Sequence, residues 1–284
     1  MINESHPIKK MATQIEERGV MVLENVTNLP AYGESYVSPF YVVGLNTRGY
    51  LRAEFDFQPV EFHPHDIVVV YPNHIFLPHE TSDDYLVTLL IMSSKFKNLL
   101  NSINPTHNTF QFCERPSFHL NEDQYEGVLS SMKAVRAISM LNNSNREEML
   151  AAQMDVFSSL LEAYMKQNGE VMFGKQSSVQ QLLMRFQEAI AQHYRESREV
   201  QFYANLLYFT PKYFGSLIRQ ETGIGASDWI ARYIIIRAKS MLRHRPDLTI
   251  QQISYQLGFP HQTAFTRYFK ANAGMAPKDY RDMG

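Results

Sequence analysis

The sequence contains a single cysteine, Cys113, in 284 residues, which excludes an internal disulfide and fits a reducing compartment. Long apolar runs are also missing. The most apolar stretch, Leu86–Met92, is far shorter than the ~20 residues of a membrane-spanning helix. The first six residues lack the basic-then-apolar pattern of a secretory signal. We therefore expect a cytoplasmic protein with no membrane partner.

Excess charge is small as well, with a net charge of −2, but it is unevenly distributed. Residues 185–284 contain 14 Lys/Arg against 8 Asp/Glu, or +6, whereas residues 1–184 contain 13 against 21, or −8. The hydrophobic content of 44% is typical of globular proteins, and the length suffices for two domains. The difference in net charge between the two parts favours a C-terminal module that binds a polyanion and an N-terminal domain with another function.

The C-terminal third of the chain repeats itself. Val200-Gln201 is matched by Ile250-Gln251 at an offset of fifty, and Phe214 is matched by Phe265 at an offset of fifty-one. Each copy is typical of a short helix, a tight turn and a second helix. The change of offset predicts one extra residue in the second turn, near Pro260-His261. Two helix-turn-helix units on one chain predict a domain that contacts DNA twice.

The second helix of each unit is expected to turn a polar face outward. A connecting helix from Trp229 to about Leu242 would span ~21 Å. With the width of the flanking helices, this length permits both units to reach major-groove faces ~34 Å apart. The outward residues are Lys212, Gly215, Ser216, Arg219 and Gln220 in the first unit, and Gln262, Thr263, Thr266, Arg267 and Lys270 in the second.

The C-terminal domain resembles the DNA-binding domain of the AraC/XylS family of transcription regulators. The residues that carry the resemblance are Thr210-Pro211-Lys212-Tyr213-Phe214, Glu221-Thr222-Gly223, Arg237-Ala238-Lys239, Ile253-x-x-x-Leu257-Gly258-Phe259, Phe265-x-x-x-Phe269-Lys270 and Gly274-Met275-x-Pro277-x-x-Tyr280-Arg281. The resemblance implies binding to double-stranded promoter DNA, with RNA polymerase as a further partner. Gly215 departs from the family pattern because that position often carries a base-reading side chain.

Carried over by position, eight residues are expected to contact DNA. Arg267 can bind guanine and Gln262 can bind adenine through paired hydrogen bonds, whereas Arg219 and Lys270 are suited to phosphates. The eight residues are Lys212, Ser216, Arg219, Gln262, Thr263, Thr266, Arg267 and Lys270.

Residues 31–118 are rich in Val, Tyr, Phe and Ile, with turn residues at short intervals. Stretches at 40–43, 50–55, 67–71 and 85–92 are typical of strands, and together they predict a sandwich or small barrel. The element His65–Asn73 is similar to part of the family's cupin-like effector domain. This similarity implies a small-molecule effector inside the barrel. The candidate lining residues are Phe40, Tyr41, Tyr50, Phe55 and Phe57, which could equally fill a core in a domain that binds no ligand.

An alternative for this domain is a metal-dependent cupin enzyme fused to the DNA-binding module. His-x-His is a cupin ligand pattern, and imidazoles at alternate strand positions share a face. The residues concerned are His63, His65, His74 and His79, with Glu80 nearby. We favour the regulator over the enzyme and expect no catalytic residues, bound metal or cofactor.

Helical spacing of apolar residues begins near Asn121, which is a helix start, and Ser144 with Glu147 predicts a capping box for a second helix. Two such helices either pack on the strand domain or pair with a second copy. We favour a homodimer, because pairing benefits a protein that binds repeated sites. The predicted fold is thus α+β: a cupin-like β-barrel sensor domain (1–118), a helical dimerisation segment (119–168), a linker (169–178) and an all-α domain of two helix-turn-helix motifs (179–284).

Overall fold

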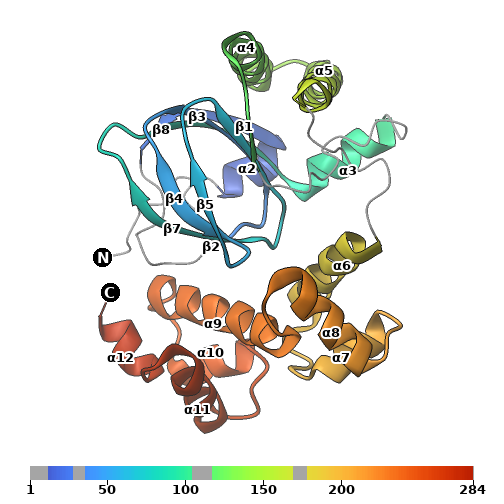
Figure 1. The fold of residues 1–284 in the computed structure, drawn as a ribbon. Coiled ribbons are helices and arrows are strands. Elements are labelled where there is room, and N and C mark those ends of the chain that lie inside the picture. The colour runs from blue at the N-terminus through green and yellow to red at the C-terminus, as the bar shows by residue number, and fades with distance from the viewer. Residues whose placement is uncertain (1–11, 28–35, 104–116, 169–177, 284) are drawn as a thin grey trace. The chain divides into compact units, whose positions relative to one another are not determined.

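A computed structural model describes residues 12–27, 36–103, 117–168 and 178–283 (Figure 1). The chain divides into two compact units, one within residues 4–174 and the other from residue 175 onward. Strands and helices build the first unit, and the described residues of the second are helical. The predicted α+β class is therefore confirmed. No helix of the described residues is both long and apolar enough to cross a membrane.

The strands of the first unit form two antiparallel sheets, which matches the prediction of a sandwich or small barrel. In the five-stranded sheet the order is β1 (Val20–Val26), β8 (Leu86–Met92), β3 (Tyr41–Arg48), β6 (Asp66–Val70) and β9 (Ser117–His119). In the four-stranded sheet it is β2 (Tyr36–Val37), β7 (Ile75–Thr81), β4 (Leu51–Phe55) and β5 (Gln58–Phe62).

The five-stranded sheet is buried on both faces. Successive side chains of a strand point to opposite faces. In β8, Leu89 and Ile91 therefore join a core that also contains Phe55 and Phe62 of the other sheet. Leu90 and Met92 join a second core with the helices on the opposite face. Burial on both sides explains why β8 is almost entirely apolar.

Helices α4 (Glu122–Ser139) and α5 (Arg146–Gln167) cover the second face of this sheet (Figure 1). The apolar stripes that sequence reasoning assigned to pairing between chains are used inside the unit instead. Their buried residues include Val128, Met132 and Val135 from α4, and Leu150, Met154, Phe157 and Leu161 from α5. These residues are core, so any contact between copies through these helices must use their outer faces.

The capping prediction is confirmed for α4 and wrong for α5. The Asn121 side chain accepts a hydrogen bond from the Gln124 backbone, and the Gln124 side chain accepts one from the Asn121 backbone. In α5 the N-cap is Asn145, without a side-chain capping bond, and the Ser144 hydroxyl donates to Asn145 Oδ1. Sequence reasoning did not predict α2 (Ala12–Arg18) or strands β1, β2, β5, β7 and β9.

Helix α3 (Ser94–Ile103) buries a lysine together with its apolar face. Lys97 is 6% exposed, and its Nζ donates a hydrogen bond of 2.8 Å to Asn101 Oδ1. Burial removes hydration from the ammonium group and lowers the pKa of Lys97 to about 8, against the opposing attraction of Asp155 on α5. The charged form of Lys97 therefore costs the fold stability near neutral pH.

The described residues of the C-terminal unit form seven helices, which are α6 (Ser178–His193), α7 (Val200–Leu206), α8 (Pro211–Thr222), α9 (Ala226–His244), α10 (Ile250–Gln256), α11 (Gln262–Ala273) and α12 (Pro277–Asp282). The predicted helix-turn-helix pairs are α7 with α8 and α10 with α11, and the predicted connecting helix is α9. Residues 207–210 connect α7 to α8, and residues 257–261 connect α10 to α11. The extra residue predicted for the second turn is thus present.

Candidate nucleic-acid interface

Helices α8 and α11 are the second helices of the two helix-turn-helix units, and they end in the same way. Thr210 caps α8 by accepting a hydrogen bond from the Tyr213 backbone, and Pro211 occupies the first helical position, where no N–H is needed. Both helices stop at a left-handed glycine, Gly223 with φ 70° and Gly274 with φ 80°. These local signals set the start of α8 and the end of both helices, each of which has 12 residues.

One face of each helix is anchored in the core of its unit. In α8, Phe214 and Ile218 are fully buried, and the Phe214 ring packs edge-on against Phe186 of α6 at 4.9 Å. In α11, Phe265 and Phe269 are fully buried. Because residues three and four apart share a helix face, this burial turns the intervening polar residues outward.

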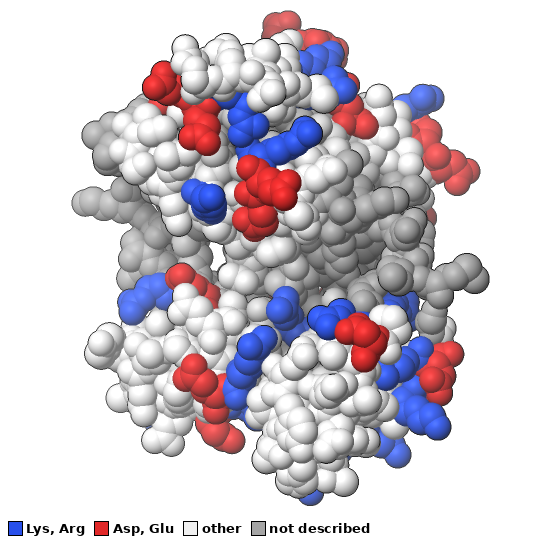
Figure 2. Space-filling model, turned by 180° about the vertical axis from the view of Figure 1, so that it is seen from behind, with Lys and Arg blue, Asp and Glu red and all other residues white. Residues whose placement is uncertain are grey.

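The eight predicted contact residues all lie on these outward faces. Thr266 is half-buried, and Lys212, Ser216, Arg219, Gln262, Thr263, Arg267 and Lys270 are exposed. Within the described residues, none of the four cations among them forms an ion pair. Figure 2 shows basic side chains spread over the visible face of the C-terminal unit, in the lower half of the view. The arrangement leaves two polar, positively charged helix faces available to a polyanion.

The first helix presents less side chain at its centre than the second. Gly215 is the counterpart of Thr266 in the repeat and has no side chain. A Cβ atom at Gly215 would have no neighbour within 4 Å, so the surface of α8 is open at this point. Sequence reasoning missed Tyr208, which is 91% exposed and holds a left-handed φ of 65° in the turn before α8. The signal was available, because Gly258 occupies the equivalent position in the second unit.

Gly258 is required by a close backbone approach as well as by its φ of 74°. A Cβ atom there would overlap the carbonyl group of Arg195, in the segment between α6 and α7. The overlap also shows that the second turn packs directly on a segment that precedes the first unit.

The connecting helix α9 is longer than predicted. It begins at Ala226 rather than Trp229, ends at His244, and its 19 residues span about 28 Å. Trp229 Nε1 donates to Thr222 Oγ1 at 3.3 Å, which ties α9 to the end of α8. At its other end, Lys239 and Arg243 lie over the ring of Tyr280 on α12. Helix α9 is therefore attached to both helix-turn-helix units.

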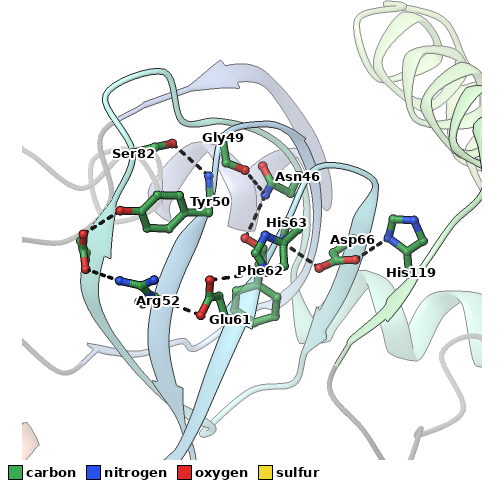
Figure 3. Close-up of polar contacts among 11 residues, drawn as sticks. Asn46, Gly49, Tyr50, Arg52, Glu61, Phe62, His63, Asp66, Ser82 and His119 are labelled. Carbon is green, nitrogen blue, oxygen red and sulfur yellow. Dashed lines mark hydrogen bonds and ion pairs between the residues drawn. The ribbon is translucent and has the colours of Figure 1, made fainter.

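The five predicted effector-lining residues do not lie together. Phe40 and Phe55 belong to the core between the two sheets, whereas Tyr41 packs against the core beneath α4 and α5. Tyr50 points its hydroxyl to Glu80, 2.6 Å away and exposed (Figure 3). Phe57 is half-buried in the turn between β4 and β5, with a φ of 68°. Phe40 and Phe55 alone face the space between the sheets.

The histidines of the metal alternative are also dispersed. Each has its own carboxylate partner: His63 with Glu61, His65 with Glu122, His74 with Asp56 and His79 with Glu54. Figure 3 shows His63 beside Asp66, which also pairs with His119 at 2.9 Å. Within the described residues, no group of three or more His, Cys, Asp and Glu side chains is placed to hold a metal ion.

Glu80 illustrates the use of these polar residues. Its carboxylate accepts hydrogen bonds from the Tyr50 hydroxyl and from Arg52 Nη1, which itself lies beside Glu61. The two donors lower the pKa of Glu80, with Tyr50 as the larger cause. This network joins strands β4, β5 and β7 on the exposed side of their sheet (Figure 3). Tyr50, Arg52, Glu61 and Glu80 therefore link neighbouring strands at the surface of the sheet.

Comparison with known proteins agrees with the geometry of the C-terminal unit. Residues 203–283 match the family described as "Helix-turn-helix domain". An uncharacterized HTH-type transcriptional regulator of Bacillus subtilis, YobQ, is 32% identical over 93 residues, which are 33% of this chain and 38% of YobQ. The regulatory protein PocR of Salmonella typhimurium is 29% identical over 89 residues, covering 31% of this chain and 29% of PocR. The C-terminal unit is thus a double helix-turn-helix domain of the AraC/XylS type.

The solved structure of ToxT from Vibrio cholerae shares the fold over nearly the whole chain. The similarity has a TM-score of 0.51 at 16% identity and covers 93% of this chain and 98% of ToxT. The curated relatives, by contrast, are matched over less than two fifths of their own lengths. Sequence similarity therefore identifies the C-terminal domain, and the structural similarity extends the fold to the N-terminal unit.

Proposed function

We propose that the protein is a transcription regulator that binds promoter DNA through α8 and α11. The carrying observation is the pair of equivalent helices, each anchored by two buried residues and each exposing its predicted contact residues. The family match and the regulator names of the relatives support this proposal. Such a protein acts in the cytoplasm and influences RNA polymerase at the promoter. The dispersal of the histidines gives the metal-enzyme alternative no support.

Selection of bound fragments from genomic DNA tests this function. We expect a recurring sequence with two half-sites, bound with an affinity that falls steeply as salt rises, because Lys and Arg release counterions from phosphates. The affinity for unrelated DNA should be lower by a factor of at least about 10³. Recovery of random fragments, or a bound sequence with no preference at any position, would refute the proposal.

We further propose that a small-molecule effector binds between the two sheets, near Phe40 and Phe55. This location is supported by their place in the core shared by both sheets, whereas Tyr41, Tyr50 and Phe57 lie elsewhere. Thermal unfolding in the presence of metabolites tests the idea, since a ligand raises stability by RT ln(1+[L]/Kd). If a ligand raises the unfolding temperature, Phe55→Leu should reduce the rise. A ligand effect that Phe55→Leu leaves unchanged would place the site elsewhere.

A homodimer is proposed through the outer face of α5. This face carries a stripe without charge at helical spacing, in which Met149 is 40% exposed and Val156 is 58% exposed. The other exposed members are Ala152, Ser159 and Ala163. Small and apolar side chains in such a row allow two helices to approach closely, and a second copy buries the same row from the other side.

Val156→Asp is expected to weaken this dimer, because the interface would bury an unpaired carboxylate. The dimer dissociation constant should rise at least about 30-fold, equivalent to ~2 kcal/mol. Sedimentation equilibrium measures the constant. Asn98→Asp, which adds the same charge to the exposed side of α3, serves as the control and should leave the dimer unchanged. Equal behaviour of the two variants would show that α5 is not the interface.

A further inference from the structure

The segment between α6 and α7 contacts both helix-turn-helix units. Its last residues lead directly into α7 of the first unit, and Tyr203 of α7 holds the segment by donating its hydroxyl to the Ser197 carbonyl at 2.9 Å. The same segment packs on the second unit, because the Arg195 carbonyl fills the space beside Gly258. The two units are therefore joined at a second place, in addition to α9.

Arg198 makes the most specific of these contacts. Its Nη2 donates a hydrogen bond of 2.9 Å to the Leu257 carbonyl at the end of α10. The guanidinium carbon, Cζ, lies 3.7 Å from the ring centroid of Phe259 and 5.9 Å from the ring centroid of Tyr268. Tyr268 is a residue of α11 and follows Arg267 in sequence. Arg198, which lies just before α7, thus reaches the second recognition helix.

The interaction depends on the shape of the guanidinium as well as its charge. No carboxylate among the described residues pairs with Arg198, and burial lowers its pKa. A planar guanidinium can donate to a carbonyl from its edge while its face lies on an aromatic ring, which an ammonium group cannot do. The rings of Phe259 and Tyr268 are 5.3 Å apart and provide that surface.

The repeat shows that this contact is particular to the first unit. At the offset of fifty, Leu248 is the counterpart of Arg198. An apolar residue at this position is therefore compatible with a helix-turn-helix unit. Since the second unit forms with a leucine here, a helix-turn-helix unit as such does not require an arginine at this position.

We propose that Arg198 is a positioning residue that fixes the second recognition helix relative to the first. Helix α9 packs on α10, α11 and α12, and the attachment at Leu257 and Phe259 adds a second restraint on the position of α11 from the other side of the repeat. A fixed separation of the two helices sets the spacing of half-sites that the protein accepts. This inference rests on the proposed function, which assigns α8 and α11 to DNA.

The first test measures affinity for the selected DNA and for versions with one to three base pairs inserted between the half-sites. Wild type should lose at least about 30-fold on insertion, whereas Arg198→Leu should bind the native spacing about tenfold more weakly and lose less than about threefold on insertion. Arg198→Lys, which keeps the charge, should behave like Arg198→Leu. Binding to an isolated second half-site should stay unchanged. Full discrimination between spacings in both variants, or an equal loss on the isolated half-site, would overturn the proposal.

A measurement without DNA separates this inference from the proposed function. In the full chain with Cys113→Ser, spin labels at the exposed residues 220 on α8 and 271 on α11 report the distance between the helices. Wild type should give one narrow distance distribution, and Arg198→Leu or Arg198→Lys a clearly broader one. An unchanged distribution in both variants would overturn the positioning role even if the protein binds DNA as proposed. If wild type shows no sequence-specific binding but the Arg198 variants still broaden the distance distribution, only the DNA assignment is overturned.

Discussion

Arg267→Ala is expected to weaken binding to the selected DNA by 10- to 100-fold and to remove the base preference at one position of the site. Arg267 is exposed on the outward face of α11, between the buried Phe265 and Phe269 that hold this helix. Its guanidinium can donate two hydrogen bonds to one guanine, and loss of such a pair costs ~1–3 kcal/mol. Competition binding against a library randomised at each position measures both effects.

Lys270→Ala on the same helix is the matched control for this prediction. Lys270 is exposed one turn further along, where a phosphate contact is expected. Its loss should weaken all sequences alike and reduce the slope of affinity against salt by about one counterion. If Arg267→Ala also weakens all sequences equally and changes the salt slope, then Arg267 contacts phosphate and the base-reading role is wrong.

Lys97→Met is expected to stabilise the N-terminal unit by ~2–3 kcal/mol at pH 7. The folded protein holds the pKa of Lys97 at about 8, below the ordinary lysine value of 10.5. Between these values the unfolded chain binds more protons than the folded one, so the stability of wild type rises with pH from about 8 to 10.5. Below pH 8 the cost of burying the ammonium is present in full. Methionine removes that cost at similar volume.

Urea unfolding at pH 7 and pH 10 checks this prediction. The variant should be more stable than wild type at pH 7, and most of the difference should vanish at pH 10. Asn101→Ala isolates the hydrogen bond from Lys97 Nζ and should lower stability at pH 7 without abolishing the pH dependence. A Lys97→Met protein that is less stable at both pH values would mean that the ammonium gains more from Asn101 and Asp155 than burial costs.

The C-terminal domain could be predicted from sequence because its signals are local. Thr210 and Pro211 start α8, Thr249 and Gln252 form a capping box at the start of α10, and Gly274 ends α11. Each of these features acts within one turn of helix, so the linear spacing contains the needed information. The outward placement of the contact residues followed from the same spacing. Their contacts with DNA remain a prediction.

The N-terminal unit was less predictable because strand partners are distant in sequence. Strand β7 contains Pro78 and the exposed His79 and Glu80, so it lacks the apolar alternation by which strands were assigned. Neighbouring Phe40 and Tyr41 were assigned to one pocket, yet adjacent strand residues face opposite sides of a sheet. Likewise, the stripes of α4 and α5 indicated burial without indicating which surface covers them.

Strand β8 gives the N-terminal unit a property of its own. Because it lies between β1 and β3 and supplies alternate side chains to two cores, an opening that displaces β8 disturbs the packing of both cores. A change in the core between the two sheets is therefore transmitted by β8 to the core beneath α4 and α5. Leu89 and Ile91 are bonded directly to Leu90, so a displacement of this strand toward one core also shifts the side chains that fill the other.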